Sequence, residues 1–129
     1  VMGPPCSSWG TAADRGPAGA IRSVTLPWGL PPEMLSVRQQ ARLALGNNIF
    51  RHALRLLRWL AKAGLPCALE HPINSRIWHT KELLTLIAQF GGIIQVLDQC
   101  QVGTRWRKRT KLLFVNVAWD DTVKFGRRC

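Results

Sequence analysis

The sequence predicts an α/β fold that forms the carboxyl-terminal half of a doubly wound sheet. Short apolar segments that end in polar residues alternate with longer segments of helical periodicity, which is the pattern of strands joined by helical crossovers. The 47% hydrophobic and 19% charged residues are typical of one folded domain. The connection before the last apolar segment is short, which predicts that the final strand pair is antiparallel.

Strands are expected at the start of the chain and at residues 67–69, 93–97 and 111–117. Each is a short apolar run bounded by Gly, Pro or polar residues. The first begins at Val1 and stops at two prolines, which lack the backbone N–H that strand pairing needs. Both chain ends look like cuts, so we expect residues 1–129 to be a partial domain with a tail at 120–129.

Residues 33–63 and 80–90 are expected to be helical, because their apolar residues recur near every 3.6 positions. Gly46-Asn47-Asn48 could divide or bend the first helix, and Gly64 should end it. Several basic residues fall on its polar face, where a solvated surface is the default interpretation. They are Arg51, Arg55, Arg58 and Lys62.

Residues 7–32 are rich in Gly, Pro and small side chains, which predicts a long loop. Loops of this length in a compact domain are usually functional or mobile, and this one could close over a substrate. Trp9 and Trp28 within it could stack on a nucleic-acid base. They could equally anchor the loop to the core, which is the commoner fate of tryptophan.

The chain is strongly basic, with 18 Lys and Arg against seven Asp and Glu and a net charge of +11. Such a charge favours a polyanionic partner through phosphate contacts, and nucleic acid is the leading candidate. The alternative is that an acidic remainder of a longer protein balances it. No apolar run is long enough to cross a bilayer, so no membrane association is expected.

The four cysteines lie far apart, with no C-x-x-C pair. This spacing indicates neither a zinc site nor a disulfide framework, so we expect a reducing, intracellular compartment, with the nucleus as one option. Cys6 follows the first strand, at the edge where open α/β sheets bind ligands. It is a candidate nucleophile if a nearby cation or base lowers its pKa. The alternative is a small residue packed in a tight turn.

Glu70 likewise follows the strand at 67–69, so Cys6 and Glu70 are expected on one edge of the sheet. The basic segment at 103–109 enters the last strand from the same edge. Side chains alternate along an extended chain. Arg105, Arg107 and Arg109 should therefore point together toward Cys6, while Lys108 points away.

These segments, in this order, resemble a known family. Gly3-Pro4-Pro5-Cys6, Glu70-His71-Pro72 and residues 105–109 resemble the fourth, sixth and eighth motifs of the cytosine-C5 DNA methyltransferases. The whole chain is similar to the carboxyl-terminal part of S-adenosylmethionine-dependent methyltransferase-like domains in eukaryotic retroelement-type and protist open reading frames. Those share the Gly-Pro-Pro-Cys, a Glu-(Asn/His)-Pro-x-x-Ser-x-x-Trp at 70–78, an Asp-Gln-Cys at 98–100 and a Gly-x-x-x-(Arg)-Lys-x-Thr at 103–110.

The resemblance implies a Rossmann-like sheet and methyl transfer from S-adenosylmethionine to C5 of cytosine in nucleic acid, with DNA the expected kind. Cys6 would add to C6 of the base, and Glu70 would stabilise the developing charge at N3 and the exocyclic amine. Arg105, Arg107 and Arg109 would bind the base or its phosphate. The base would be flipped out of a duplex or offered in a single strand.

Two residues depart from the family pattern: His71 stands where asparagine is usual, and Arg105-Trp106 where glutamine is expected. A Gly-rich cofactor loop would precede Val1, so this stretch alone is not expected to bind S-adenosylmethionine or to be active. Two alternatives remain. One is a noncatalytic nucleic-acid-binding module derived from such an enzyme in a mobile element, and the other is a structural fragment. The sequence does not indicate an oligomeric state.

Overall fold

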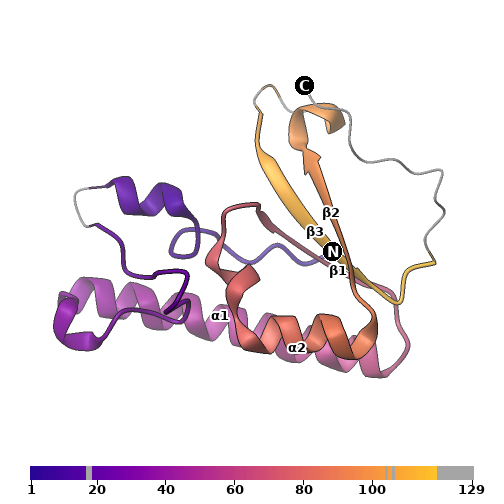
Figure 1. Ribbon diagram of the computed structural model, residues 1–129, viewed down its shortest axis with the longest axis horizontal. Helices are drawn as coiled ribbons and strands as arrows, with labels where there is room; N and C mark the ends of the chain where they lie inside the picture. Colours follow the sequence, from indigo (N-terminus) through magenta and orange to yellow (C-terminus); the bar gives the residue numbers. More distant parts are fainter. Residues whose placement is uncertain (17–18, 104, 106, 119–129) are drawn as a thin grey trace.

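The computed structural model describes residues 1–16, 19–103, 105 and 107–118. Figure 1 shows two layers, a three-stranded sheet above and two helices beneath it, so the mixed α/β prediction is confirmed. The helices are α1 (Val37–Lys62) and α2 (Lys81–Phe90), and the strands are β1 (Cys67–Pro72), β2 (Ile93–Asp98) and β3 (Arg109–Val115). Short 3-10 segments lie at Thr11–Arg15, Pro32–Met34, Arg76–His79 and Gln99–Val102.

Strand β3 lies between β1 and β2 and is antiparallel to both, so β1 and β2 run parallel to each other. The predicted antiparallel final pair, β2 with β3, is therefore confirmed. Strand β1 extends three residues past the expected end, and β3 begins two residues early. The reason is the long register between them, which continues to the pair Pro72–Thr110.

The amino-terminal stretch adds to the sheet beside β1. Met2 forms a parallel bridge with Leu69. The Met2 N–H donates to the Ala68 carbonyl at 2.8 Å, and the Glu70 N–H donates to the Met2 carbonyl at 2.8 Å. Pro4 and Pro5 follow and have no N–H to extend this pairing, so the chain turns away from the sheet here.

One face of the sheet packs against both helices. Leu69 of β1 and Leu113 of β3 join one core cluster with Phe50 and Leu57 of α1 and with Leu83 of α2. Since side chains alternate along a strand, the neighbouring residues of β1 point to the opposite face. Within the described residues, neither helix is long and apolar enough to cross a membrane.

Helix α1 begins at Val37, four residues later than the sequence predicts, because Ser36 supplies a capping box. The Gln39 N–H donates to Ser36 Oγ at 3.4 Å, and the Ser36 N–H donates to Gln39 Oε1 at 2.7 Å. Such reciprocal bonds satisfy donors that have no partner within the helix. The predicted stop is confirmed, because Gly64, just beyond the helix, has a φ of 69°, a left-handed conformation that favours glycine.

Gly46-Asn47-Asn48 does not divide α1, so that expectation is wrong. A Cβ on Gly46 would lie 2.2 Å from Ser8 Oγ and 3.0 Å from Nη2 of Arg22. The glycine is needed because the loop crosses the helix at this point. Asn47 holds the same loop, since its Oδ1 accepts from Arg22 at 2.7 Å and its Nδ2 donates to the Trp28 carbonyl at 2.9 Å.

We predict that Gly46→Ala destabilises the protein although alanine is the better helix former. The new methyl group should cost roughly 1–3 kcal/mol through overpacking, which outweighs a helix-propensity gain of about 1 kcal/mol. Urea denaturation gives the free energy of unfolding. Asn48→Ala, at an exposed neighbouring position, is the control and should change stability by only a few tenths of a kcal/mol. A Gly46→Ala variant that is more stable than the wild-type protein would contradict the close approach of the loop to helix α1 at Gly46.

Candidate functional site

The turn that carries Cys6 starts beside Glu70. Glu70 follows Leu69 in β1 and points away from the helices, to the face on which Gly3 lies. A Cβ built on Gly3 would be 3.3 Å from Glu70 Oε2, a tight contact, so glycine at this position lets the carboxylate lie close to the turn. Three residues span at most about 11 Å, which keeps Cys6 near the same end of β1.

The Cys6 side chain is exposed and is a free thiol. Its carbonyl accepts from the N–H of Trp9 at 3.1 Å and from the N–H of Gly10 at 3.0 Å. These two bonds close the turn directly after the cysteine. The thiol is therefore presented to solvent from a hydrogen-bonded turn rather than packed into the core.

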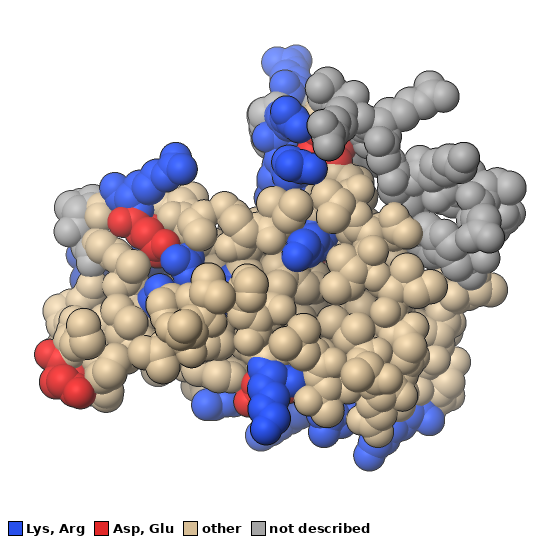
Figure 2. Space-filling view, in the orientation of Figure 1, with Lys and Arg blue, Asp and Glu red and all other residues tan. Residues whose placement is uncertain are grey.

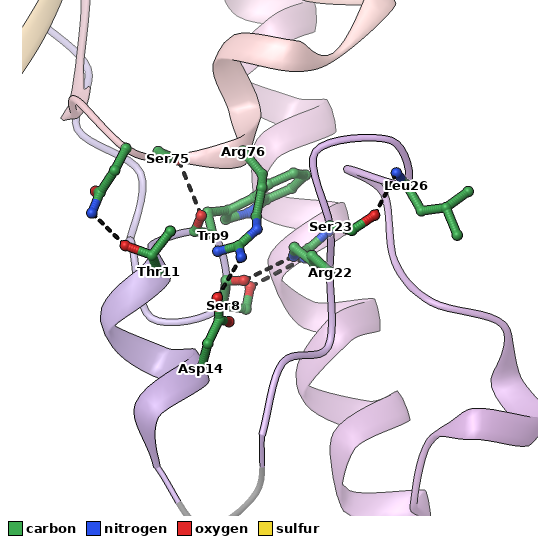
Figure 3. Close-up of polar contacts among 10 residues, drawn as sticks. Ser8, Trp9, Thr11, Asp14, Arg22, Ser23, Leu26, Ser75 and Arg76 are labelled. Atoms are coloured by element: carbon green, nitrogen blue, oxygen red, sulfur yellow. Dashed lines mark hydrogen bonds and ion pairs between the residues drawn. The ribbon is translucent and has the colours of Figure 1, made fainter.

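Arg22 holds this turn from behind, as Figure 3 shows. Its side chain is 1% exposed. Its Nε donates to the Ser8 carbonyl at 2.9 Å, and its Nη2 donates to Ser8 Oγ at 3.1 Å. Its Nη1 donates to the Pro27 carbonyl at 2.9 Å and to Asn47 Oδ1 at 2.7 Å. One guanidinium thus ties together the Cys6 turn, the following loop and helix α1.

The charge of Arg22 is stabilised by neutral groups. The guanidinium carbon lies 3.5 Å from the centre of the Trp9 ring, a cation–π contact. Its hydrogen-bond acceptors among the described residues are carbonyl, hydroxyl or amide oxygens. Burial, and then the nearby charge of Arg76, lower the pKa of Arg22 to about 9. The side chain still carries its proton at neutral pH.

A second buried arginine holds the turn from the other side. The Arg76 N–H donates to the Trp9 carbonyl at 3.0 Å, and Ser75 Oγ donates to the same carbonyl at 3.4 Å. The Arg76 guanidinium pairs with Asp14 of the loop. The segment after Cys6 is therefore fixed between two arginines that come from distant parts of the chain.

Both loop tryptophans anchor the loop rather than offering a free stacking surface. Trp9 is 1% exposed and its Nε1 donates to the Gly46 carbonyl at 3.2 Å. Trp28 packs edge-on to Trp9 at 5.5 Å and against Phe50 at 5.6 Å, between ring centres. Of the two alternatives for these residues, the described geometry supports the anchor.

Glu70 is contacted by a lysine. Its Oε1 accepts from Gln99 Nε2 at 3.3 Å and lies 3.5 Å from Lys108 Nζ. The expectation that Lys108 would point away from the site is therefore wrong. Lys108 belongs to the segment that leads into β3. Because both side chains of this ion pair are partly exposed, the pair contributes only a modest free energy to stability.

Arg107 and Arg109 do share a direction, but both reach Asp98. Asp98 Oδ2 accepts from Arg107 Nε at 2.9 Å, and Asp98 Oδ1 lies 3.5 Å from Arg109 Nε. The carboxylate is almost fully buried at the end of β2, whereas the two arginine side chains remain about half exposed. Arg105 is exposed. The arginines thus keep open donors while Asp98 orients two of them.

His71 lies next to Glu70 but on the helix-facing side of β1, and it is fully buried. Neither ring nitrogen makes a hydrogen bond. Burial, and then the positive charge of Lys108, lower the pKa of His71 to about 4. The nearby Pro4 carbonyl acts in the opposite direction, although it does not form a full hydrogen bond with the ring. His71 is therefore neutral at physiological pH, and it contributes packing rather than charge.

The other described cysteines differ from Cys6. Cys67 is a free but buried thiol, and burial raises its pKa, which makes it a poor nucleophile. Cys100 is disulfide-bonded, which the cysteine spacing did not predict. Cys6 is thus the exposed free thiol among the described residues.

Sequence reasoning missed the roles of four residues of this site: Arg22, Arg76, Asp98, which was named only within the Asp-Gln-Cys motif, and Lys108 as a partner of Glu70. Asp98 stands at the carboxyl end of a predicted strand, a position that could have marked it. Arg22 and Arg76 carry no such signal, because the sequence alone does not distinguish a buried arginine from a solvent-exposed one. No family model, curated protein or solved structure matches this chain, so its function is inferred from its own residues.

We predict that Arg22→Lys destabilises the protein by roughly 2–4 kcal/mol. An ammonium group cannot reach acceptors on three segments at once, so buried carbonyl and amide oxygens lose their donors. Arg38→Lys, at an exposed position of helix α1, is the matched control and should hardly change the free energy of unfolding. Guanidinium denaturation followed by tryptophan fluorescence measures both. Equal effects of the two substitutions would show that Arg22 does not organise the loop.

We predict that acid destabilises the fold through His71. Its pKa is lower in the folded state than in the unfolded chain, where it is about 6.5. The unfolded chain therefore binds a proton first, and stability falls as the pH drops from about 6.5 to about 4, by about 1.4 kcal/mol per pH unit. Denaturation at several pH values should show this slope reduced in His71→Gln. His52→Gln, at an exposed position, should keep the wild-type slope, and a wild-type slope in His71→Gln would contradict the assignment.

Proposed function

We propose that the Cys6 turn and Glu70 form the base-reacting site of a cytosine-C5 methyltransferase-like protein that acts on nucleic acid, with DNA as the expected substrate. The observation that carries the proposal is the parallel pairing of Met2 with β1, which starts the Gly3-Pro4-Pro5-Cys6 turn beside the Glu70 carboxylate. A thiol and a carboxyl group at one end of a sheet suit chemistry on a flat base.

The finer fold assignment is part of this proposal. A strand stub parallel to β1, with β2 parallel to β1 and β3 inserted antiparallel between them, supports the carboxyl-terminal half of a Rossmann-like sheet. In such sheets ligands bind outside the carboxyl ends of the parallel strands. Cys6, Glu70 and Asp98 all lie at that end.

The chemistry proposed for Cys6 is addition of its thiolate to C6 of cytosine. A carbon–sulfur bond forms, the C5–C6 double bond breaks, and its electron pair moves toward C5 and N3. The Glu70 carboxyl group would hydrogen-bond at N3 and so stabilise this charge. C5 can then take a proton from water and lose its original one. Expulsion of the thiolate restores cytosine.

The arginines are proposed to bind the phosphates around that base. Arg105, Arg107 and Arg109 lie in or beside the segment that leads into β3, and their exposed guanidinium edges match phosphate oxygens. Asp98 neutralises part of this charge, but it also fixes the direction of two side chains. A fixed guanidinium loses less conformational entropy on binding.

S-adenosylmethionine, which the resemblance implies, would supply the methyl group that C5 accepts. Among the described residues the strand ends do not fit it: β1 leads into the 3-10 turn Arg76–His79 and β2 into Gln99–Val102, and neither connection is a Gly-rich turn into a helix. The residues that would bind the cofactor are therefore not identified in this chain. Thiol addition and proton exchange need no cofactor, so they depend on these residues alone.

The second candidate is a noncatalytic nucleic-acid-binding module. One observation favours it: helix α1 carries six Arg and Lys and no Asp or Glu over its 26 residues, which supports binding without any chemistry at Cys6.

We predict that the protein catalyses exchange of the C5 hydrogen of cytosine with solvent deuterium. The substrate is a single-stranded oligonucleotide that contains cytosine, incubated in D₂O without cofactor, and mass spectrometry or NMR follows deuterium at C5. Cys6→Ser should abolish exchange, because a serine hydroxyl is far less nucleophilic than a thiolate. Glu70→Gln should reduce it by about 10²-fold or more, the contribution of a positioned acid.

Cys67→Ala is the control, since it removes the other described free thiol without touching the turn, and it should keep the exchange rate. Binding of the same oligonucleotide should be nearly unchanged in Cys6→Ser. Binding without exchange in the wild-type protein would support the noncatalytic module and overturn the catalytic proposal.

A further inference from the structure

A hollow of about 280 Å³ lies between helix α1, the loop and the start of α2. Its lining residues are Trp28, Arg51, Leu54, Arg55, Arg58 and Glu82, and we name it the α1 groove. Cys6, Glu70 and Asp98 do not line it. In Figure 2, Lys and Arg gather along the lower edge, where Figure 1 places the helices, and separately near the upper end of β3.

The α1 groove carries an excess of positive charge, with three arginines and one glutamate in its lining. Arg51, Arg55 and Arg58 follow one another at steps of four and three, so they share one face of the helix. Among the described residues, neither Arg55 nor Arg58 makes an ion pair or a hydrogen bond through its side chain, in contrast to the arginines beside Asp98. Like charges at this spacing destabilise a helix by a few tenths of a kcal/mol per pair. An anionic ligand would remove that repulsion.

One carboxylate lines the α1 groove, and it is already engaged. Glu82 Oε2 accepts from Trp28 Nε1 at 3.0 Å. Arg51 lies over the Trp28 ring, with its guanidinium carbon 5.1 Å from the ring centre. Glu82 and Arg51 are thus both used to fix the tryptophan wall, which leaves Arg55 and Arg58 as the open donors.

The Trp28 side of the groove also indicates which part of a nucleic acid could bind here. Trp28 packs against Trp9 and Phe50, and the Arg51 guanidinium lies over its ring, so Trp28 is a poor stacking surface for a base. What the groove offers is guanidinium groups, whose planar donors match phosphate oxygens. Arg51 and Arg58 are separated by about 10.5 Å along the helix axis, which is about three steps of a nucleic-acid strand.

From this geometry we propose that the α1 groove binds the phosphodiester backbone of nucleic acid. It gives the protein a second contact with its substrate strand, at a distance from the Cys6 turn and without reading the bases. Phosphate binding in the groove requires no chemistry at Cys6. The proposal therefore applies both to an enzyme and to a noncatalytic binding module.

The test is the salt dependence of binding to a fluorescein-labelled 20-base-pair DNA duplex, measured by anisotropy between 50 and 200 mM NaCl. Two lost phosphate contacts should lower the slope of log K against log salt concentration by about 1.8 on duplex DNA. Arg55→Ala combined with Arg58→Ala is therefore expected to show that change. A thermal melt shows that the variant is folded.

Arg38→Ala combined with Lys62→Ala is the matched control. It removes the same charge from exposed positions of the same helix, outside the groove, and its slope should change by less than one unit. Cys6→Ser should leave the slope unchanged, so failure of the catalytic proposal is distinguishable from failure of this one. Equal slopes for the two double variants, or an unchanged slope in Arg55→Ala/Arg58→Ala, would overturn the groove assignment.

Discussion

The buried guanidinium of Arg22 is the contact on which the amino-terminal half of this structure depends. The described residues between 7 and 32 contain no strand and only short 3-10 turns, so they cannot satisfy their backbone groups by regular pairing. Arg22 supplies several donors at one point and directs them to Ser8, Pro27 and Asn47. A buried charge is costly unless it is fully hydrogen-bonded, so this arrangement tolerates little change.

This constraint explains how a loop can present a reactive group. The Cys6 turn is held on one side by Met2, which pairs with β1, and on the other by Ser8 and Trp9, which contact the two buried arginines. The turn between these anchors has little freedom. A thiol fixed in this way loses less entropy when it meets a substrate, and Gly3 leaves room for the neighbouring carboxylate.

The positive charge of the chain is distributed in two different ways. At the end of the sheet, Asp98 and Glu70 pair with Arg107, Arg109 and Lys108, so the cations there are oriented and partly neutralised. Along α1 the arginines have no acidic neighbour on their own helix. Oriented charge suits positioning of one nucleotide, whereas uncompensated charge suits binding of any phosphate backbone.

The sequence by itself determined the element types, because periodicity, proline and glycine act locally: both helices, three strands and the helix end at Gly64 were predictable. It also predicted that Cys6 and Glu70 follow parallel strands, whereas Glu70 lies within β1 and Met2 forms an isolated parallel bridge to that strand. Only the tertiary structure decided that Gly46 is a crossing point rather than a break, that β3 inserts between β1 and β2, and that Lys108 rather than an arginine meets Glu70. Those features depend on contacts between residues far apart in the chain, and no local pattern encodes which arginine will be buried.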